Sequence, residues 1–286
     1  MKGAVTAMFT IREKSWLSSG VYRYEIEAPR LAKKTQPGQF VILRGDERGE
    51  RIPLTVADFD RERGSITVIF QVVGASTELL ARMEEGDDLL DLVGPLGQPS
   101  HIAPGIGTVV CVGGGIGIAP VYPIVRGMKE AGNRVISILG AKSREVLIME
   151  EEMRAASDEV LVTTNDGSYG IEGFVTTALK ELFERGEKID LIYAIGPVVM
   201  MKNVVEAARP WGIKTIVSLN PVMVDGTGMC GGCRVEVGGK TKFACVDGPE
   251  FDGAVVDFAQ LSARQGMYRE MEAAARAHVC RIGLGR

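Results

Sequence analysis

Long apolar runs, an excess of basic residues and an even set of cysteines are all missing from this sequence. No stretch reaches the roughly 18–20 apolar residues of a membrane span, and the opening MKGAVTAMFTIREKSW is too interrupted by charge for a signal peptide. The net charge of −4 argues against a nucleic-acid-binding protein. The odd count of five cysteines argues against a disulfide framework. These absences predict a cytoplasmic protein with no membrane or nucleic-acid partner.

Short β-strand patterns fill the first hundred residues. Segments rich in β-branched and aromatic residues alternate with turns of Gly, Pro and Asp; they are VYRYEIEA, GQFVILRG, RIPLTVADF and SITVIFQVV. One helical pattern, STELLARMEEG, follows them. Strands repeated at about ten-residue spacing predict an antiparallel barrel or sandwich.

Strand patterns alternate with helical patterns from about residue 105 onward. The strand patterns are GTVVCV, RVISILGA, VLVTT, DLIYAIG and KTIVSL, separated by helical patterns such as PVYPIVRGMKEAG and FVTTALKELFERG. This alternation predicts a parallel sheet with helices on both faces. From residue 222 we expect a glycine- and cysteine-rich loop, a short strand pair and a terminal helix near residues 254–278.

Three cysteines at close spacing indicate a metal site in that loop. Cys230 and Cys233 are separated by two residues, and Cys245 follows eleven residues later. Plant-type [2Fe–2S] loops have the pattern Cys-x4-Cys-x2-Cys with a further distant Cys, and the first position of this pattern, separated from Cys230 by four residues, holds Asp225. A carboxylate can ligate iron, so we expect a [2Fe–2S] cluster on these four residues. The alternatives are a zinc knuckle or free thiols for the cysteines, and a plain Asp-Gly turn for Asp225.

Two further segments predict nucleotide binding. Between the first α/β strand and its helix lies GGGIGIAP, where bare glycine backbone and a helix N-terminus suit a pyrophosphate. The pattern GGxGxAP resembles the nicotinamide-nucleotide loop of the ferredoxin–NADP reductase superfamily, and AIGPVVMMK resembles the segment that lies near the nicotinamide there, with Ile195 in place of a frequent Cys. The residues expected to bind the nucleotide are Gly114, Gly115, Gly117, Ala119, Pro120, Gly196, Pro197 and Met200.

A flavin motif is expected in the first hundred residues. RIPLTVAD matches the Arg-x-Pro-aliphatic-Ser/Thr motif of the same superfamily, in which Arg51 would bind a diphosphate and Thr55 would reach the flavin ring. The later QVVGASTELL places hydroxyl residues at a helix N-terminus suited to phosphate, although plain helix capping explains them too. The residues expected to bind the flavin are Arg51, Pro53, Leu54, Thr55, Gly74, Ser76 and Thr77.

The three signatures in this order resemble one family across almost the whole chain: the electron-transfer subunits of class B dihydroorotate dehydrogenase. Asp225 in the first ligand position, where that family has a fourth cysteine, resembles a second branch: the small subunits of NADH-dependent reduced ferredoxin:NADP oxidoreductase, an electron-bifurcating enzyme. The resemblance implies a β + α/β chain with an FAD-binding antiparallel β-barrel at 1–100, an NAD(P)-binding α/β domain at 101–221 and a [2Fe–2S] segment with a terminal helix at 222–286.

The resemblance also implies a function. We expect an oxidoreductase subunit that uses FAD, NAD(H) and a [2Fe–2S] cluster, with no catalytic side chain of its own, in a heterodimer with a large subunit that holds a second flavin and [4Fe–4S] clusters and connects to ferredoxin. Dihydroorotate dehydrogenase, a hydrogenase or a glutamate synthase-like protein are alternative partners, and a cofactor-free regulatory module is an alternative of another class. Lys142, Ser143 and Arg144 could hold an NADP 2′-phosphate or form a solvated turn; the resemblance favours NAD(H).

Overall fold

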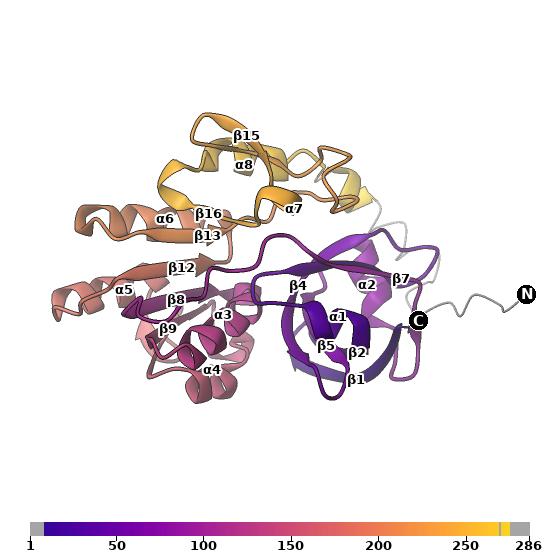
Figure 1. Ribbon diagram of the computed structural model, residues 1–286, viewed down its shortest axis with the longest axis horizontal. Coiled ribbons are helices and arrows are strands. Elements are labelled where there is room, and N and C mark those ends of the chain that lie inside the picture. Colours follow the sequence, from indigo (N-terminus) through magenta and orange to yellow (C-terminus); the bar gives the residue numbers. More distant parts are fainter. Residues whose placement is uncertain (1–8, 269, 275–286) are drawn as a thin grey trace, which may run out of the picture.

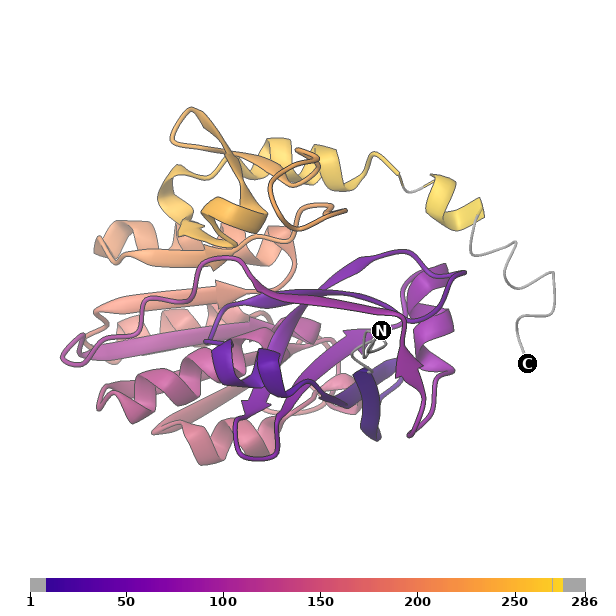
Figure 2. The same cartoon turned by 45° about the vertical axis from the view of Figure 1, so that its right-hand side comes forward.

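The computed structural model describes residues 9–268 and 270–274, and in them the chain forms two large β-sheets and a smaller C-terminal segment (Figure 1). The N-terminal sheet curls into a barrel, and the second sheet is covered by helices. The C-terminal segment lies above both of them, as the turned view in Figure 2 also shows. The predicted β + α/β fold is therefore confirmed.

The barrel is a seven-stranded antiparallel sheet in the order β6-β1-β2-β5-β4-β3-β7. Its strands are β1 (Phe9–Ser18), β2 (Val21–Glu27), β3 (Phe40–Arg44), β4 (Ile52–Asp60), β5 (Ser65–Gln71), β6 (Asp88–Leu89) and β7 (Asp91–Leu96), with helices α1 (Pro29–Lys34) and α2 (Ala75–Ala81). Alternate residues of β2 point into the barrel, where Tyr24 is fully buried and donates its hydroxyl hydrogen to the carbonyl of Leu80 at 2.6 Å. This bond holds α2 against the barrel.

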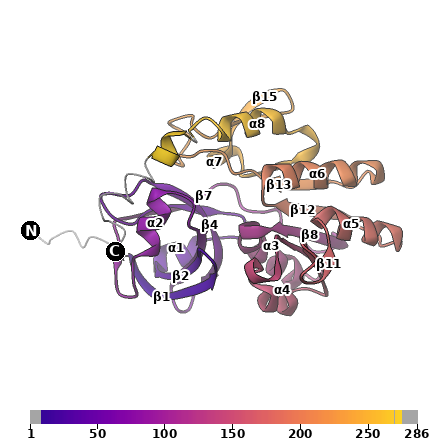
Figure 3. The same cartoon turned by 180° about the vertical axis from the view of Figure 1, so that it is seen from behind.

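The second sheet is parallel except at one edge and has the order β11-β10-β9-β8-β12-β13-β16. Its strands are β8 (Thr108–Gly114), β9 (Arg134–Ala141), β10 (Glu159–Thr164), β11 (Ile171–Glu172), β12 (Leu191–Ile195), β13 (Thr215–Ser218) and β16 (Glu250–Asp252). Helices α3 (Ile118–Glu130) and α4 (Glu150–Ala156) pack on one face, and α5 (Val175–Glu184) and α6 (Val198–Ala208) pack on the other. The view from behind in Figure 3 shows α3 beside the barrel.

The C-terminal segment contains the hairpin β14 (Arg234–Val237) and β15 (Lys240–Phe243), the short helix α7 (Ala244–Asp247) and α8 (Phe258–Gln265). The predicted terminal helix is interrupted: α8 ends before Gly266, the chain turns at 266–268, and residues 270–274 are helical again. Cys280 lies outside the described residues. No helix within the described ranges has the length and apolar character that a membrane crossing requires.

Candidate functional site

The glycine loop after β8 packs directly on the turn between β12 and α6. A Cβ atom on Gly117 would lie 2.2 Å from the carbonyl oxygen of Ile195, and one on Gly114 would lie 2.2 Å from the sulfur of Met200. A larger residue at Gly117 would collide with the backbone of this turn, whereas one at Gly114 would displace the Met200 side chain. The fold therefore brings together the two segments that the sequence assigns to the nicotinamide nucleotide, including Gly196 and Pro197.

The outer side of the same loop is open. Gly115 has φ +55°, and a Cβ there would meet no atom within 4 Å. Pro120 lies in the first turn of α3, and Ala119 beside it is buried among core residues. Bare backbone at the start of a 13-residue helix fits a pyrophosphate, because its amide groups and the helix dipole favour negative charge.

The flavin motif lies on β4, on the side of the barrel that faces the other two parts of the molecule. Pro53 pairs with Ile42 of β3, and Thr55 pairs with Phe40. Leu54 and Thr55 are half-buried, whereas Arg51 is exposed and its nearest acid, Asp91, is 4.0 Å away. Arg51 therefore remains available to a diphosphate.

The residues of α2 are close to Arg51 but their hydroxyl groups are already engaged. Ser76 accepts a hydrogen bond from the amide of Glu50, next to Arg51, at 3.0 Å. The Thr77 hydroxyl accepts from the amides of Val73 and Gly74 at 3.0 Å each, which is helix capping. The position of a Cβ on Gly74 is open space. The sequence-based contacts of Ser76 and Thr77 with a flavin phosphate stay predictions.

The cysteine loop lies against the partner strand of the flavin motif. Gly226 has φ +75°, and a Cβ on it would lie 2.8 Å from side-chain atoms of both Ile42 and Leu96. Ile42 is the residue that pairs with Pro53 of the flavin motif. The buried Cys233 and Cys245 belong to the same apolar cluster as Phe40 and Ile42. One strand of the barrel therefore separates the cysteine loop from the flavin motif.

The four expected metal ligands form two pairs. Cys233 and Cys245 are both buried, with their sulfur atoms 3.1 Å apart. Asp225 and Cys230 are joined by the Cys230 amide, which donates to Asp225 Oδ2 at 2.8 Å. Within residues 9–268 and 270–274, no three His, Cys, Asp or Glu side chains gather around one point as ligands of a single ion would. Three thiols and one carboxylate are a donor set suited to an iron–sulfur cluster.

Asp225 also makes the bonds of a turn residue. Its Oδ1 accepts from the amide of Thr227 at 2.6 Å, and these backbone hydrogen bonds hold the pKa of its carboxyl below the usual range. Burial, with the neighbouring Cys233 thiol, raises the pKa of Cys245 to about 12, so this thiol keeps its proton unless a metal displaces it. The turn geometry and a ligand role for Asp225 are compatible, because each carboxylate oxygen can accept more than one partner.

Two residues that sequence reasoning passed over join the three parts of the molecule. In the turn GPLGQP at 94–99, Gln98 donates its side-chain amide to the carbonyl of Val246 at 2.9 Å and its backbone amide to the carbonyl of Gly248 at 2.6 Å. Glu250 on β16 accepts from the Ser100 hydroxyl at 2.5 Å, and burial raises the pKa of this carboxyl to about 7. No pattern in the sequence marks either contact, since the partners are 148 and 150 residues apart.

The loops after β9 and β10 lie together at the carboxyl edge of the sheet. The Arg144 guanidinium stacks 5.0 Å over the ring of Tyr169, and the Arg144 amide donates to Ser168 at 2.9 Å. The amide of Asp166 donates to the carbonyl of Lys142 at 3.3 Å, which brings an exposed carboxylate beside Lys142, Ser143 and Arg144. No sequence pattern connects Asp166 with residues 142–144, because it follows a different strand.

Comparison with known protein families matches two segments of the chain. Residues 111–206 match the oxidoreductase NAD-binding domain, and residues 220–257 match the iron–sulfur cluster binding domain of dihydroorotate dehydrogenase B. Both matches fall on the parts of the structure described above.

Similar proteins cover almost the full chain. A homolog of the electron-transfer subunit of dihydroorotate dehydrogenase B from Thermotoga maritima is 50% identical over 93% of this chain and 94% of its own. The corresponding subunit from Geobacillus thermodenitrificans is 33% identical over 85% of this chain and 95% of its own. A solved chain of NADH-dependent reduced ferredoxin-NADP oxidoreductase, studied for flavin-based electron bifurcation, is 48% identical with a TM-score of 0.91, covering 98% of this chain and all of that one.

Proposed function

This chain belongs to the family of dihydroorotate dehydrogenase B electron-transfer subunits and their homologues, and from that premise we propose that it is the small subunit of an electron-bifurcating NADH-dependent ferredoxin:NADP oxidoreductase. In this role it exchanges hydride between NAD(H) and FAD and relays single electrons to or from a large subunit. Two contacts carry the proposal: the glycine loop packs on the β12–α6 turn, and the cysteine loop packs on the strand paired with the flavin motif.

The chain's own residues bind and orient the cofactors. When bound, NAD(H) and FAD supply two-electron hydride chemistry, and an iron–sulfur cluster supplies one-electron transfer. Arg51 and the start of α2 would hold the flavin diphosphate, and Thr55 would reach its ring. Gly114, Gly115 and Gly117 would hold the pyrophosphate of the nicotinamide nucleotide. No side chain has to move a proton, so we assign no acid or base.

The cluster is proposed to be [2Fe–2S] with Asp225 as its fourth ligand. The separation of the ligands into the pairs Cys233–Cys245 and Asp225–Cys230 supports this, since each iron of a binuclear cluster takes two protein ligands. The sulfur atoms of Cys233 and Cys245 lie 3.1 Å apart, so both thiols face one point.

The nucleotide is proposed to be NAD(H) rather than NADP(H). Arg144 is stacked on Tyr169, and the exposed carboxylate of Asp166 lies beside the turn at 142–144. A carboxylate there would accept the hydroxyls of the adenosine ribose and repel a 2′-phosphate. The relative named for NADH dependence agrees with this preference.

The partner is proposed to be a large subunit with a second flavin and [4Fe–4S] clusters that connects this chain to ferredoxin. Met229, next to Cys230, is 88% exposed, and Val224, next to Asp225, is 55% exposed. Exposed apolar side chains beside a redox centre are typical of a docking surface. The second candidate partner is dihydroorotate dehydrogenase, which the 33% identical relative serves.

An anaerobic titration of the purified chain tests this proposal. We expect bound FAD, about two irons and two sulfides per chain, and bleaching of the flavin by NADH at lower concentration than by NADPH. A purified chain without bound flavin would refute the electron-transfer role and favour a regulatory one. Zinc in place of iron and sulfide would refute the cluster assignment. Equal or better reduction by NADPH would refute the nucleotide assignment alone.

A further inference from the structure

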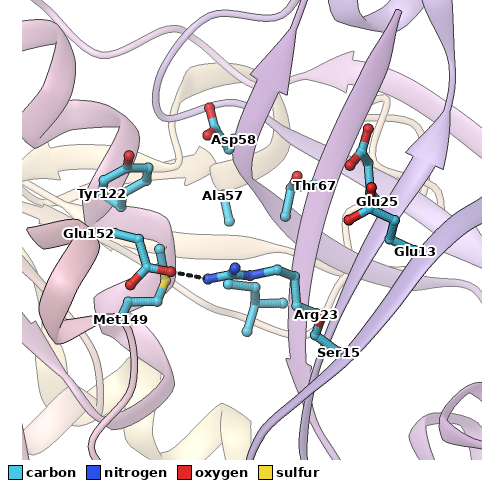
Figure 4. A pocket seen from close by; sticks show the side chains of 11 residues that line it. Glu13, Ser15, Arg23, Glu25, Ala57, Asp58, Thr67, Tyr122, Met149 and Glu152 are labelled. Atoms are coloured by element: carbon cyan, nitrogen blue, oxygen red, sulfur yellow. Dashed lines mark hydrogen bonds and ion pairs between the residues drawn. The ribbon is translucent and has the colours of Figure 1, made fainter. Parts of the chain in front are cut away.

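Two ion pairs join the barrel to the nucleotide domain. Arg126 of α3 binds Asp58 of β4, and Arg23 of β2 binds Glu152 of α4. Figure 4 shows Arg23 and Glu152 facing each other from the two domains, with Asp58 and Tyr122 opposite one another above them. We call the two pairs, Asp58–Arg126 and Arg23–Glu152, the interdomain clamp.

A polar cavity of about 170 Å³ lies between the two pairs. It is lined from both domains, with Glu25 and Thr67 on the barrel side and Tyr122 and Glu152 on the helical side. Its polar lining and volume suit water. At this cavity both the clamp and apolar packing connect the two domains, because Ala57 and Ile69 line it and belong to the core cluster of the nucleotide domain.

The Asp58–Arg126 pair connects the two elements that carry the nucleotide sites. Asp58 lies on β4, three residues after Thr55 of the flavin motif. Arg126 lies on α3, whose first residue follows the glycine loop at 115–117. The guanidinium of Arg126 also lies 5.3 Å from the centre of the Phe59 ring and 5.9 Å from that of Tyr122. It therefore contacts one ring on β4 and one on its own helix.

We propose that Asp58 and Arg126 are positioning residues for hydride transfer, fixing the glycine loop and its helix at a set distance from the flavin strand. This inference rests on the proposed function, in which a hydride passes from NADH to FAD and one further proton comes from solvent. Hydride transfer requires the donor and acceptor atoms to approach to about 3–3.5 Å, and a misplacement of about 1 Å can slow a reaction a hundredfold. A link between β4 and α3 controls that approach without touching either nucleotide.

The pair is suited to positioning rather than to stability. Its side chains are 36% exposed for Asp58 and 29% exposed for Arg126. Partly exposed pairs contribute little to the free energy of unfolding. Asp58 also accepts the amide of Phe59 at 2.7 Å, and Arg126 approaches Glu130 at 3.6 Å, so each side chain is oriented by its own element before it meets the other.

The test compares Asp58→Asn, Arg126→Gln and the conservative Arg126→Lys in the full chain loaded with its cofactors. Arg134→Gln is the matched control, because Arg134 pairs with Glu159 and Glu187 inside the nucleotide domain alone. The measurements are the rate of flavin reduction at saturating NADH in a rapid-mixing experiment, the Kd for NADH, and hydrogen exchange at residues 56–59 and 122–126 in the cofactor-free chain.

We expect Asp58→Asn and Arg126→Gln to slow flavin reduction by about tenfold or more with the Kd for NADH changed by less than about twofold. Arg126→Lys, which keeps the charge, and the charge-exchanged double variant Asp58→Arg with Arg126→Asp should recover part of the rate. Hydrogen exchange at both segments should increase in the cofactor-free single variants. Arg134→Gln should behave as the wild type.

Unchanged rates in both single variants, with the wild-type flavin reduced normally, would overturn the inference. So would equal losses in the Arg134→Gln control, or a lower rate that follows only from weaker NADH binding. If NADH does not reduce the flavin of the wild type, the proposed function is refuted instead. Hydrogen exchange in the cofactor-free variants would then test separately whether the Asp58–Arg126 pair holds the two segments together.

Discussion

Replacing Glu250 with glutamine should make the protein more stable at alkaline pH. The Glu250 carboxyl lies where the barrel, the nucleotide sheet and the C-terminal segment meet, with the Ser100 hydroxyl as its hydrogen-bond donor. Cys111 and Tyr193 are the neighbouring titratable groups, and the charge of Glu250 contributes to raising the pKa of both. Burial raises the pKa of Glu250 from 4.5 to about 7, and the bond from Ser100 offsets only part of this effect.

The sign and size of the effect follow from this pKa. Between pH 4.5 and about 7 the unfolded chain has lost the Glu250 proton while the folded chain keeps it, so stability falls as the pH rises. Below this range both states are protonated and above it both are ionised, so the loss of stability is complete only above pH 7. A shift of this size corresponds to about 3 kcal/mol, which in a chain of this length moves the Tm by roughly 6 °C.

The assay is thermal unfolding of the wild type, Glu250→Gln and the control Glu181→Gln from pH 5 to 8.5. Glutamine keeps an acceptor for Ser100 and has no charge, so the Tm of Glu250→Gln should exceed that of the wild type at pH 8 and match it near pH 5. Glu181 is exposed on α5, so the control should follow the wild type. A constant Tm difference across this pH range would refute the reasoning.

Three further predictions concern the proposed binding residues. Gly117→Ala places a Cβ 2.2 Å from the Ile195 carbonyl oxygen, so we expect the free energy of unfolding to fall by about 1–3 kcal/mol and NADH to bind more weakly. Gly74→Ala, where the Cβ position is open, is the control in thermal unfolding. Equal Tm values for the two variants would contradict this prediction. Asp225→Cys should retain a [2Fe–2S] cluster with a shifted potential and EPR spectrum, and an unchanged spectrum would mean that Asp225 is not a ligand. Asp166→Ser should improve reduction of the flavin by NADPH relative to NADH, which paired titrations measure; an unchanged ratio would remove Asp166 from the specificity assignment.

The sequence predicted the features that depend on local patterns. The strand and helix alternation of the second sheet is confirmed, with β9 at the predicted residues 134–141. The glycines at 114 and 117 could be assigned to one loop because strand, glycines and helix follow one another in the chain. Such features need only neighbours in sequence, and periodicity reports them directly.

The sequence did not predict contacts that depend on the tertiary arrangement. Strand β16 has three residues, and its pairing with β13 gives no pattern of its own. The Asp58–Arg126 pair joins residues 68 positions apart, each of which resembles an ordinary surface charge. The sequence predicts a helix that begins near Ser76 and Thr77, and α2 begins at Ala75. Only the structure shows that the hydroxyl groups of Ser76 and Thr77 accept hydrogen bonds from backbone amides.

In the proposed function, electrons from NADH pass through a flavin to a cluster held by Asp225, Cys230, Cys233 and Cys245. Its most direct test is EPR spectroscopy of the purified chain, frozen anaerobically after addition of NADH. We expect bleaching of the flavin to be accompanied by the anisotropic EPR signal of a reduced [2Fe–2S] cluster, which differs from the narrow isotropic line of a flavin radical. A bleached flavin with no iron–sulfur signal, in protein that dithionite also leaves EPR-silent, would contradict it.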